Sequence, residues 1–187
     1  MIKRAFDIVL SVLLLLLFSL PLLLVAMAVK VTSEGPVLHW SKRIGKGNKL
    51  FLMPKFRSMK INTPQVATHL LSNADSHLTP VGGFIRKTSL DELPQLWSVL
   101  NGDMSFVGPR PALFNQDDLV KLRTDLGISN LRPGITGWAQ VNGRDELPIP
   151  VKVEFDNYYY KNASLFLDLK ILFLTAYKVV NAEGVKH

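Results

Sequence analysis

A long apolar segment near the amino terminus limits what this chain can fold into. Across residues 8–29 nearly every side chain is aliphatic, and only Ser11, Ser19 and Pro21 interrupt the run. As one straight helix this segment would be about 33 Å long, roughly the thickness of the hydrocarbon core of a bilayer. The segment therefore indicates a protein that meets a membrane.

Three structures are compatible with this segment. Lys3 and Arg4, the apolar run and the small residues around Ala28 have the pattern of a cleaved signal peptide. A single-pass anchor is the second possibility. The third is a re-entrant helix that breaks around Ser19 and Pro21, because proline removes a backbone donor and clashes with the preceding turn. Basic residues flank both ends of the segment, so the positive-inside rule gives no orientation.

Composition narrows the class of partner. The chain has 187 residues, a formal net charge of +7 and 48% hydrophobic residues, which suits one ordinary domain plus an anchor. A basic protein with an apolar start points to an anionic partner such as phospholipid or nucleotide. Nucleic acid is not expected, because the sequence lacks a recognition-helix or ribonucleoprotein signature.

Composition also limits which metal sites and nucleophiles the chain can form. Cysteine is absent, which excludes disulfides, thiolate metal sites and cysteine nucleophiles. The four histidines are scattered without metal-ligand spacing. A divalent metal would therefore be bound by oxygen, and we expect Mg²⁺ shared with substrate phosphates.

The rest of the chain predicts a mixed, helix-rich α/β fold. Turn residues and apolar periodicity alternate without an internal repeat. The expected elements are short strands over 37–60 around the turn 45–48, a loop with a short helix over 61–80, helices over 91–100 and 115–126, a loop or hairpin over 132–144, and an apolar helix over 164–180 that is too charged to span.

The strongest candidate for chemistry is the pair Asp91 and Glu92. Pro94 follows closely, and proline is tolerated only in the first turn of a helix, so a helix is expected to start near Asp91. Free N–H groups and the positive dipole at such a start suit a phosphate and hold a carboxylate ionised, as a nucleophile requires. Arg86 could neutralise a diphosphate. Ser89 and Glu92 also have capping-box spacing, so a purely structural role stays open.

A second candidate is an arginine between two prolines. Pro109 and Pro111 restrict the backbone on either side of Arg110 and hold it extended. A guanidinium positioned in this way suits bidentate binding of phosphate. The competing interpretation is a rigid turn with an exposed arginine.

The third candidate is the glycine-rich segment 132–144. Its glycines permit close approach of the backbone to a ligand, and Gln140, Asn142 and Arg144 offer polar contacts. The segment is neither a Walker loop nor a dinucleotide fingerprint. Asn142 followed by Gly143 is also a strong tight-turn signal, so a structural hairpin competes with ligand binding.

Together these motifs resemble the bacterial sugar transferase family, the monotopic phosphoglycosyl transferases, in their minimal single-domain form. Any one motif is weak, but the ordered set covers nearly the whole chain and is specific. The matching stretches are Lys3-Arg4-x-x-Asp7, Gly35-Pro36-Val37, residues 55–59, 89–96, 102–111 and 132–144, and Asp168-Leu169-Lys170.

The resemblance implies how the chain is divided. Residues 1–34 would be a re-entrant membrane helix broken at Ser19 and Pro21, although Leu20 separates these residues where the family commonly has an adjacent Ser-Pro pair. Residues 35–187 would be a catalytic domain with amphipathic membrane-surface helices, on the cytoplasmic face of the bacterial inner membrane.

The resemblance also implies an activity. Asp91 would be the nucleophile of an Asp–Glu dyad that holds Mg²⁺. It would take a phosphosugar from a UDP-sugar, release UMP and pass the phosphosugar to polyprenol (undecaprenyl) phosphate through a phospho-aspartyl intermediate, the first membrane step of glycoconjugate biosynthesis. The residues implied to bind phosphate or nucleotide are Arg86, Arg110, Gln140, Asn142, Arg144 and Asp156.

Two other functions fit part of the sequence. A non-catalytic basic protein that binds anionic lipid would explain the charge and the anchor, but not an Asp–Glu pair beside two arginines suited to phosphate. An anchored phosphohydrolase would use the same Asp91 with water in place of the lipid. No residue pattern specifies the donor sugar or an oligomeric state.

Overall fold

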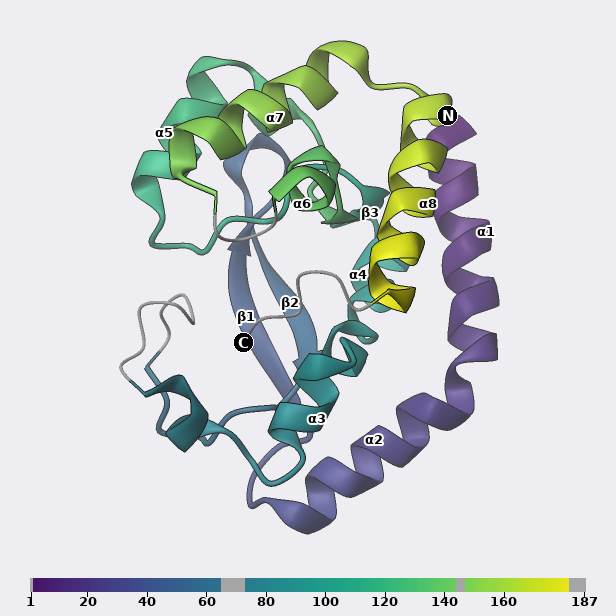
Figure 1. Cartoon of the computed structure of the whole chain (residues 1–187), viewed down its shortest axis with the longest axis vertical. Helices are drawn as coiled ribbons and strands as arrows, with labels where there is room; N and C mark the ends of the chain where they lie inside the picture. Colours follow the sequence, from purple (N-terminus) through teal and green to yellow (C-terminus); the bar gives the residue numbers. More distant parts are fainter. Residues whose placement is uncertain (1, 65–72, 144–146, 182–187) are drawn as a thin grey trace.

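The structure is a computed structural model that describes residues 2–64, 73–143 and 147–181. Arg144, one of the predicted nucleotide-binding residues, lies outside the described residues. The fold is the helix-rich mixed α/β arrangement that the sequence predicts (Figure 1). Its helices and strands are α1 (Ile2–Leu17), α2 (Ser19–Thr32), β1 (Leu38–Ile44), β2 (Leu50–Phe56), α3 (Gly82–Lys87), α4 (Gln95–Asn101), β3 (Ser105–Val107), α5 (Asp117–Asp125), β4 (Gly134–Thr136), α6 (Trp138–Gly143), α7 (Ile149–Asn162) and α8 (Leu165–Val180).

The predicted strands of residues 37–60 form an antiparallel hairpin of β1 and β2 in the middle of the molecule (Figure 1). The connection turns where expected, because Gly47 adopts a positive φ of 64° that glycine tolerates without strain. His39 pairs with Lys55 across the hairpin. One face of β2 packs into the main core together with α4, β3 and α8, through the buried side chains of Met53, Leu96, Val99, Met104, Phe106 and Ile171.

The segment 132–144 is not the loop or hairpin that its turn residues indicate. β4 pairs in parallel with β3, with Val107 opposite Thr136, and α6 follows directly. A Cβ on Gly134 would lie 2.2 Å from the backbone nitrogen of Gly108, and one on Gly137 would lie 2.1 Å from its carbonyl oxygen. The glycines therefore permit the close approach of two segments of this chain to each other. The pairing is long-range, so a local turn signal does not reveal it.

The amino-terminal segment is a bent pair of helices. α1 and α2 meet at an angle of 62°, and α2 begins at Ser19. Pro21 stands in the first turn of α2, where its missing N–H is not needed, and its ring would clash with the carbonyl of Leu17 in a continuous helix. The break therefore falls at Phe18, just before the predicted Ser19 to Pro21. Among the described helices none alone is long and apolar enough to cross a bilayer, whereas α1 and α2 together pass by length and composition.

α1 buries two polar side chains and exposes large apolar ones, while its Leu10, Leu14 and Leu15 pack against the main core. Its buried face carries Asp7, which is 1% exposed, and Ser11, which is 0% exposed. Its outward face carries Leu16 and Leu17, each 69% exposed. A helix with a leucine-rich outer face is suited to contact with lipid on that face.

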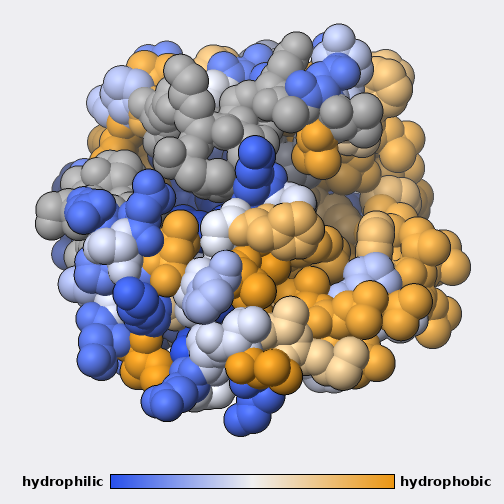
Figure 2. All heavy atoms as spheres, turned by 60° about the horizontal axis from the view of Figure 1, so that its bottom comes forward, coloured by the Kyte–Doolittle hydropathy of each residue, from blue (hydrophilic) through white to orange (hydrophobic). Residues whose placement is uncertain are grey.

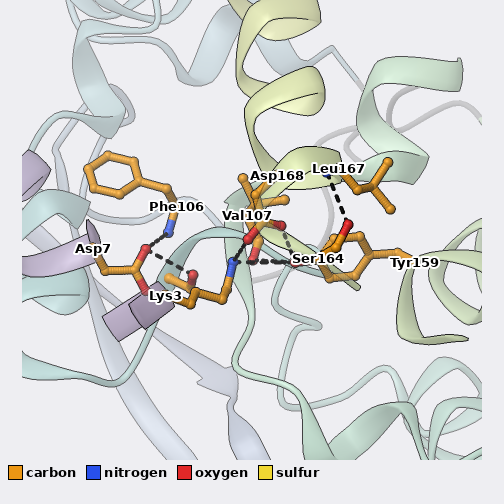
Figure 3. Close-up of polar contacts among 9 residues, drawn as sticks. Lys3, Asp7, Phe106, Val107, Tyr159, Ser164, Leu167 and Asp168 are labelled. Carbon is orange, nitrogen blue, oxygen red and sulfur yellow. Dashed lines mark hydrogen bonds and ion pairs between the residues drawn. The ribbon is translucent and has the colours of Figure 1, made fainter. Parts of the chain in front are cut away.

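Charged residues at the start of α1 dock on the rest of the protein (Figure 3). Lys3 forms an ion pair of 2.6 Å with Asp168 of α8. Arg4 donates to two backbone carbonyls in the last turn of α4, an arrangement that also complements the helix dipole. Asp7 Oδ1 accepts a 3.1 Å hydrogen bond from the backbone N–H of Phe106. These contacts join the segment to α4, β3 and α8 and favour a segment that is retained in the folded protein.

Candidate active site

The Asp–Glu pair lies in a short 3₁₀ turn, Leu90–Glu92, between α3 and α4. Ser89 enters the turn with a positive φ of 56° and makes no capping hydrogen bond with its side chain. α4 begins only at Gln95, after Pro94. The expected helix start at Asp91 and the capping box are therefore wrong in detail, because the chain makes a separate tight turn before the helix.

Glu92 is clamped between two cations. Its Oε1 atom lies 2.6 Å from Nζ of Lys55 and 3.2 Å from Nη2 of Arg110. Burial by itself would raise the pKa of Glu92, but Lys55 and Arg110 together hold the pKa well below its ordinary value. Glu92 is thus ionised throughout the physiological range. Its contacts with Lys55 and Arg110 hold both cations close to the turn that carries Asp91.

Asp91 has the opposite electrostatic character. Only 8% of the residue is exposed, and burial raises its pKa to about 6, with a further upward contribution from Glu92. The positive charges of Lys55, Arg86 and Arg110 oppose this rise. Desolvation thus exceeds the effect of the cations on Asp91, and its pKa lies above the ordinary value, whereas a helix start alone would lower it. The carboxylate still predominates at neutral pH, and it is poorly solvated.

The structure brings together four of the predicted site residues and adds one. The charges of Arg86, in the last turn of α3, and Arg110 both lower the pKa of Asp91, so both arginines lie near the dyad. Binding of phosphate by them stays a prediction. Lys55, on β2, was not singled out as a site residue. Its only sequence signal is membership of the matching stretch 55–59, because 37 positions separate it from Glu92 and no local pattern joins a strand residue to a distant turn.

The remaining predicted site residues lie elsewhere. Both side-chain amide atoms of Gln140 are buried without a hydrogen-bond partner among the described residues. Asn142 is exposed and donates to the carbonyl of Trp138 in its own helix. Asp156 is 1% exposed and accepts two hydrogen bonds from Arg123. Binding of nucleotide by these residues stays a prediction. For Asp156, burial means that any such effect would pass through Arg123.

The dyad has the oxygen ligands that a hard dication uses. No group of three or more His, Asp or Glu residues gathers in the described part of the chain, so Asp91 and Glu92 would supply only two carboxylates. Mg²⁺ commonly binds to one or two carboxylates and completes its shell with water and substrate phosphates. The donor set therefore fits Mg²⁺ that is shared with a phosphorylated substrate, and the ion itself stays a prediction.

A poorly solvated carboxyl close to three cationic side chains is suited to binding a phosphate group and reacting with it. The cations can neutralise phosphate oxygens, and the carboxylate can serve as a nucleophile. These features define the site as that of an enzyme acting on phosphoryl groups. The profile of the bacterial sugar transferase family matches residues 1–182, and the chain belongs to this family.

Curated relatives agree with this assignment. The chain is similar to the undecaprenyl-phosphate galactose phosphotransferase of Salmonella typhimurium, with 42% identity over 98% of this chain and 41% of that protein. It is similar to the UDP-glucose:undecaprenyl-phosphate glucose-1-phosphate transferase of Escherichia coli K12, with 45% identity over 95% of this chain and 40% of that protein. An uncharacterized sugar transferase of Bacillus subtilis, EpsL, is 41% identical over 99% of this chain and 90% of its own length.

The chain thus spans about two fifths of the length of the first two relatives and most of the length of the third. The names of the first two relatives specify different sugars, galactose and glucose, on the same undecaprenyl phosphate acceptor.

Proposed function

We propose that this chain is a phosphoglycosyl transferase that moves a sugar phosphate from a UDP-sugar to a polyprenol phosphate such as undecaprenyl phosphate. The observation that carries the proposal is the burial of Asp91 beside Glu92 and within the field of Lys55, Arg86 and Arg110. The names of the two longer relatives support the donor and acceptor classes.

In the first step a carboxylate oxygen of Asp91 attacks the β-phosphorus of the UDP-sugar. The bond between that phosphorus and the oxygen bridging to the α-phosphate breaks, and UMP leaves with the electron pair. Arg86, Arg110 and Lys55 would stabilise the negative charge that develops on the phosphate oxygens. Because Glu92 holds two of these cations in place, the site needs little rearrangement as the charge moves.

In the second step a phosphate oxygen of the polyprenol phosphate attacks the phosphorus of the phospho-aspartate. The bond from phosphorus to the Asp91 oxygen breaks, which restores the carboxylate and yields polyprenol diphosphate sugar. Dividing the transfer in this way means that the soluble donor and the membrane-bound acceptor need not be bound together.

Asp91 and Glu92 are the residues that would hold Mg²⁺. A bound dication would supply charge neutralisation for the diphosphate and would favour the ionised form of the Asp91 carboxyl.

The same proposal places the protein on the cytoplasmic face of the bacterial inner membrane, because UDP-sugars are cytoplasmic. Residues 1–34 would enter the bilayer and return by the same face, and residues 35–187 would form the catalytic domain. Figure 2 shows apolar side chains gathered on one side of the molecule. The large exposed apolar residues of α1, α2 and α8 include Leu13, Leu16, Leu17, Leu20, Leu23, Phe166 and Phe173.

Both helices of the bent pair pack against the remainder of the protein. Asp7 anchors α1, and Val25 and Val29 of α2 pack against Phe56 and Ile85. This arrangement supports a re-entrant topology. Because both helices contact the catalytic domain, both ends of the segment would lie on the same side of the membrane as that domain.

The proposal is tested with purified protein, undecaprenyl phosphate and a panel of UDP-sugars. Wild-type protein should release UMP and form a lipid diphosphate sugar, and Asp91→Asn should abolish both products. A donor labelled in the β-phosphate, supplied without lipid, should leave label on Asp91, and EDTA should block this labelling.

Asp125→Asn is the matched control, because this aspartate sits in an exposed ion pair on α5, and it should behave as wild type. Turnover with lipid in a protein that never carries label would indicate direct transfer. Free sugar phosphate as the product would indicate a phosphohydrolase.

A further inference from the structure

The backbone of the loop that carries Arg110 is held by donors from three other elements. The carbonyl of the preceding residue accepts a 2.9 Å hydrogen bond from the backbone N–H of Gly134 on β4. The carbonyl of the following residue accepts a 3.2 Å hydrogen bond from Nη1 of Arg43 on β1. The carbonyl of Arg110 itself accepts a 2.9 Å hydrogen bond from Nη1 of Arg123 on α5.

Arg123 is in turn oriented by Asp156 of α7. Its Nε and Nη2 atoms lie 2.9 Å and 2.6 Å from Oδ2 of Asp156. The Arg123 side chain is 9% exposed and that of Asp156 is 2% exposed, so the pair is largely shielded from solvent. Two of the three guanidinium nitrogens face the carboxylate, and the third faces the Arg110 peptide.

A buried ion pair of this kind is an inefficient way to stabilise a fold. Removing both charges from water has a desolvation cost that the attraction between them often only offsets. Arginine nevertheless suits this position, because its planar fork holds several donors in one fixed geometry. A lysine could pair with Asp156, but its single nitrogen cannot reproduce three directed contacts.

We infer that Arg123, oriented by Asp156, is a positioning residue that fixes the peptide plane of Arg110 and thereby keeps the Arg110 guanidinium on Glu92. The inference rests on the proposed function and adds to it a pair of residues that act through the backbone of Arg110. Of the three successive carbonyls that neighbouring elements hold, the middle one belongs to Arg110 itself, and Arg123 is its donor. A misplacement of about 1 Å in a charged contact can cost roughly a hundredfold in rate.

The inference predicts a loss in kcat rather than in donor affinity. Arg123→Lys keeps a positive charge beside Asp156 and should lower kcat by roughly tenfold to a hundredfold with little change in KM. Asp156→Asn should have a smaller effect in the same direction, because Arg123 keeps a hydrogen-bond acceptor but loses its charged partner.

A double-mutant cycle separates positioning from general structural support. If Arg123 acts through Arg110, then Arg123→Lys should cause almost no further loss in an Arg110→Ala background. The same loss in both backgrounds would overturn the inference. Lys121→Met, which removes an exposed ion pair from the same helix, is the control and should leave kcat and thermal stability unchanged.

A second measurement keeps this test apart from the test of the proposed function. Amide hydrogen exchange in the segment 107–116 should be faster in Arg123→Lys than in wild type and unchanged in Lys121→Met. Unchanged exchange in Arg123→Lys would overturn the inference. Failure of wild-type protein to release UMP from any UDP-sugar would count against the proposed function only, because the exchange measurement needs no substrate.

Discussion

Nζ of Lys55 lies 2.6 Å from Oε1 of Glu92, although 37 positions separate the two residues in the chain. The contact joins strand β2 to the turn that carries Asp91, and it gives the candidate active site a cation that the local sequence around the dyad does not contain. The electrostatics of both carboxyls depend on it, because the charge of Lys55 lowers the pKa of Asp91 as well as that of Glu92.

Replacing Lys55 should therefore change the pH profile and not only the rate. Lys55→Met should lower kcat/KM by on the order of a hundredfold at neutral pH, the scale for losing one donor to a developing charge. It should also move the acid limb of the profile to higher pH, since loss of a positive charge raises the pKa of Asp91. Lys55→Arg should restore the position of the limb. Lys42→Met, an exposed lysine on β1, is the control. An acid limb that stays in place in Lys55→Met would contradict this account.

Asp91 should make the protein less stable as the pH rises. Its folded pKa is about 6, above the ordinary value of 3.8, so the folded state binds the proton more tightly and the associated stability is lost as pH rises through the folded pKa. Between pH 5 and pH 8 the wild-type protein should lose about 1.4 kcal/mol relative to Asp91→Asn, from the roughly two-unit shift. Thermal unfolding of both proteins across this range measures the difference. The same change in stability between pH 5 and pH 8 in both proteins would oppose the prediction.

Arg110 should contribute through the geometry of its guanidinium as well as its charge. Arg110→Ala should raise the activation barrier by about 2–4 kcal/mol, the range for losing one charged donor in a transition state. Arg110→Lys should recover only part of this, because a single ammonium group cannot reproduce two parallel donors. Initial rates of UMP release measure both variants. Complete recovery by lysine would show that only local charge matters.

The contact between α1 and β3 should contribute measurably to the free energy of unfolding. Asp7→Leu leaves the buried N–H of Phe106 without the acceptor that it has at 3.1 Å, which should lower the free energy of unfolding by about 1–3 kcal/mol. Asp7→Asn keeps one acceptor oxygen and should cost less. Denaturation in detergent measures the loss. Val9→Ala, on the exposed face of the same helix, should cost little, and an equal loss in both variants would show that the contact itself is unimportant.

The re-entrant topology can be tested by labelling, because the chain has no native cysteine. Single cysteines at Ile2 and Glu34 should both react only from the cytoplasmic side. Pro21→Leu removes the clash that bends the segment, and together with Asp7→Leu, which releases the docked end, it should favour one straight helix and move the tail outward. A cysteine at position 2 that is labelled from outside in the otherwise unaltered protein would make α1 and α2 a single-pass anchor.

Much of the fold could be predicted from local patterns. The hairpin around residues 45–48, the helix over 164–180 and the bent amino-terminal pair agree with their expected positions to within a few residues. The strand pairing of residues 134–136 and the separate turn at Asp91 could not be predicted. Both depend on which distant segment packs against the chain, and local turn or cap signals carry no information about that partner.

The candidate site also contains residues that the sequence points to and residues that it does not. Asp91 and Glu92 are visible in the sequence because they fall in the matching stretch 89–96, just after Arg86, and Arg110 is visible because it stands between two prolines. Lys55 and Arg123 are not visible, since a lysine on a strand and an arginine on a helix are ordinary residues until the fold places them.

The sequence by itself determined the apolar amino-terminal segment with its break, the helix-rich α/β class and the residue types available for phosphate chemistry, because composition, periodicity and proline geometry act locally. Only the tertiary structure decided the charge state of the dyad. Burial raises the pKa of Asp91 to about 6, while Lys55 and Arg110 hold the pKa of its neighbour Glu92 well below its ordinary value. Desolvation and Coulomb attraction depend on distances between residues far apart in the chain, so two adjacent carboxyls acquire opposite properties only when the chain is folded.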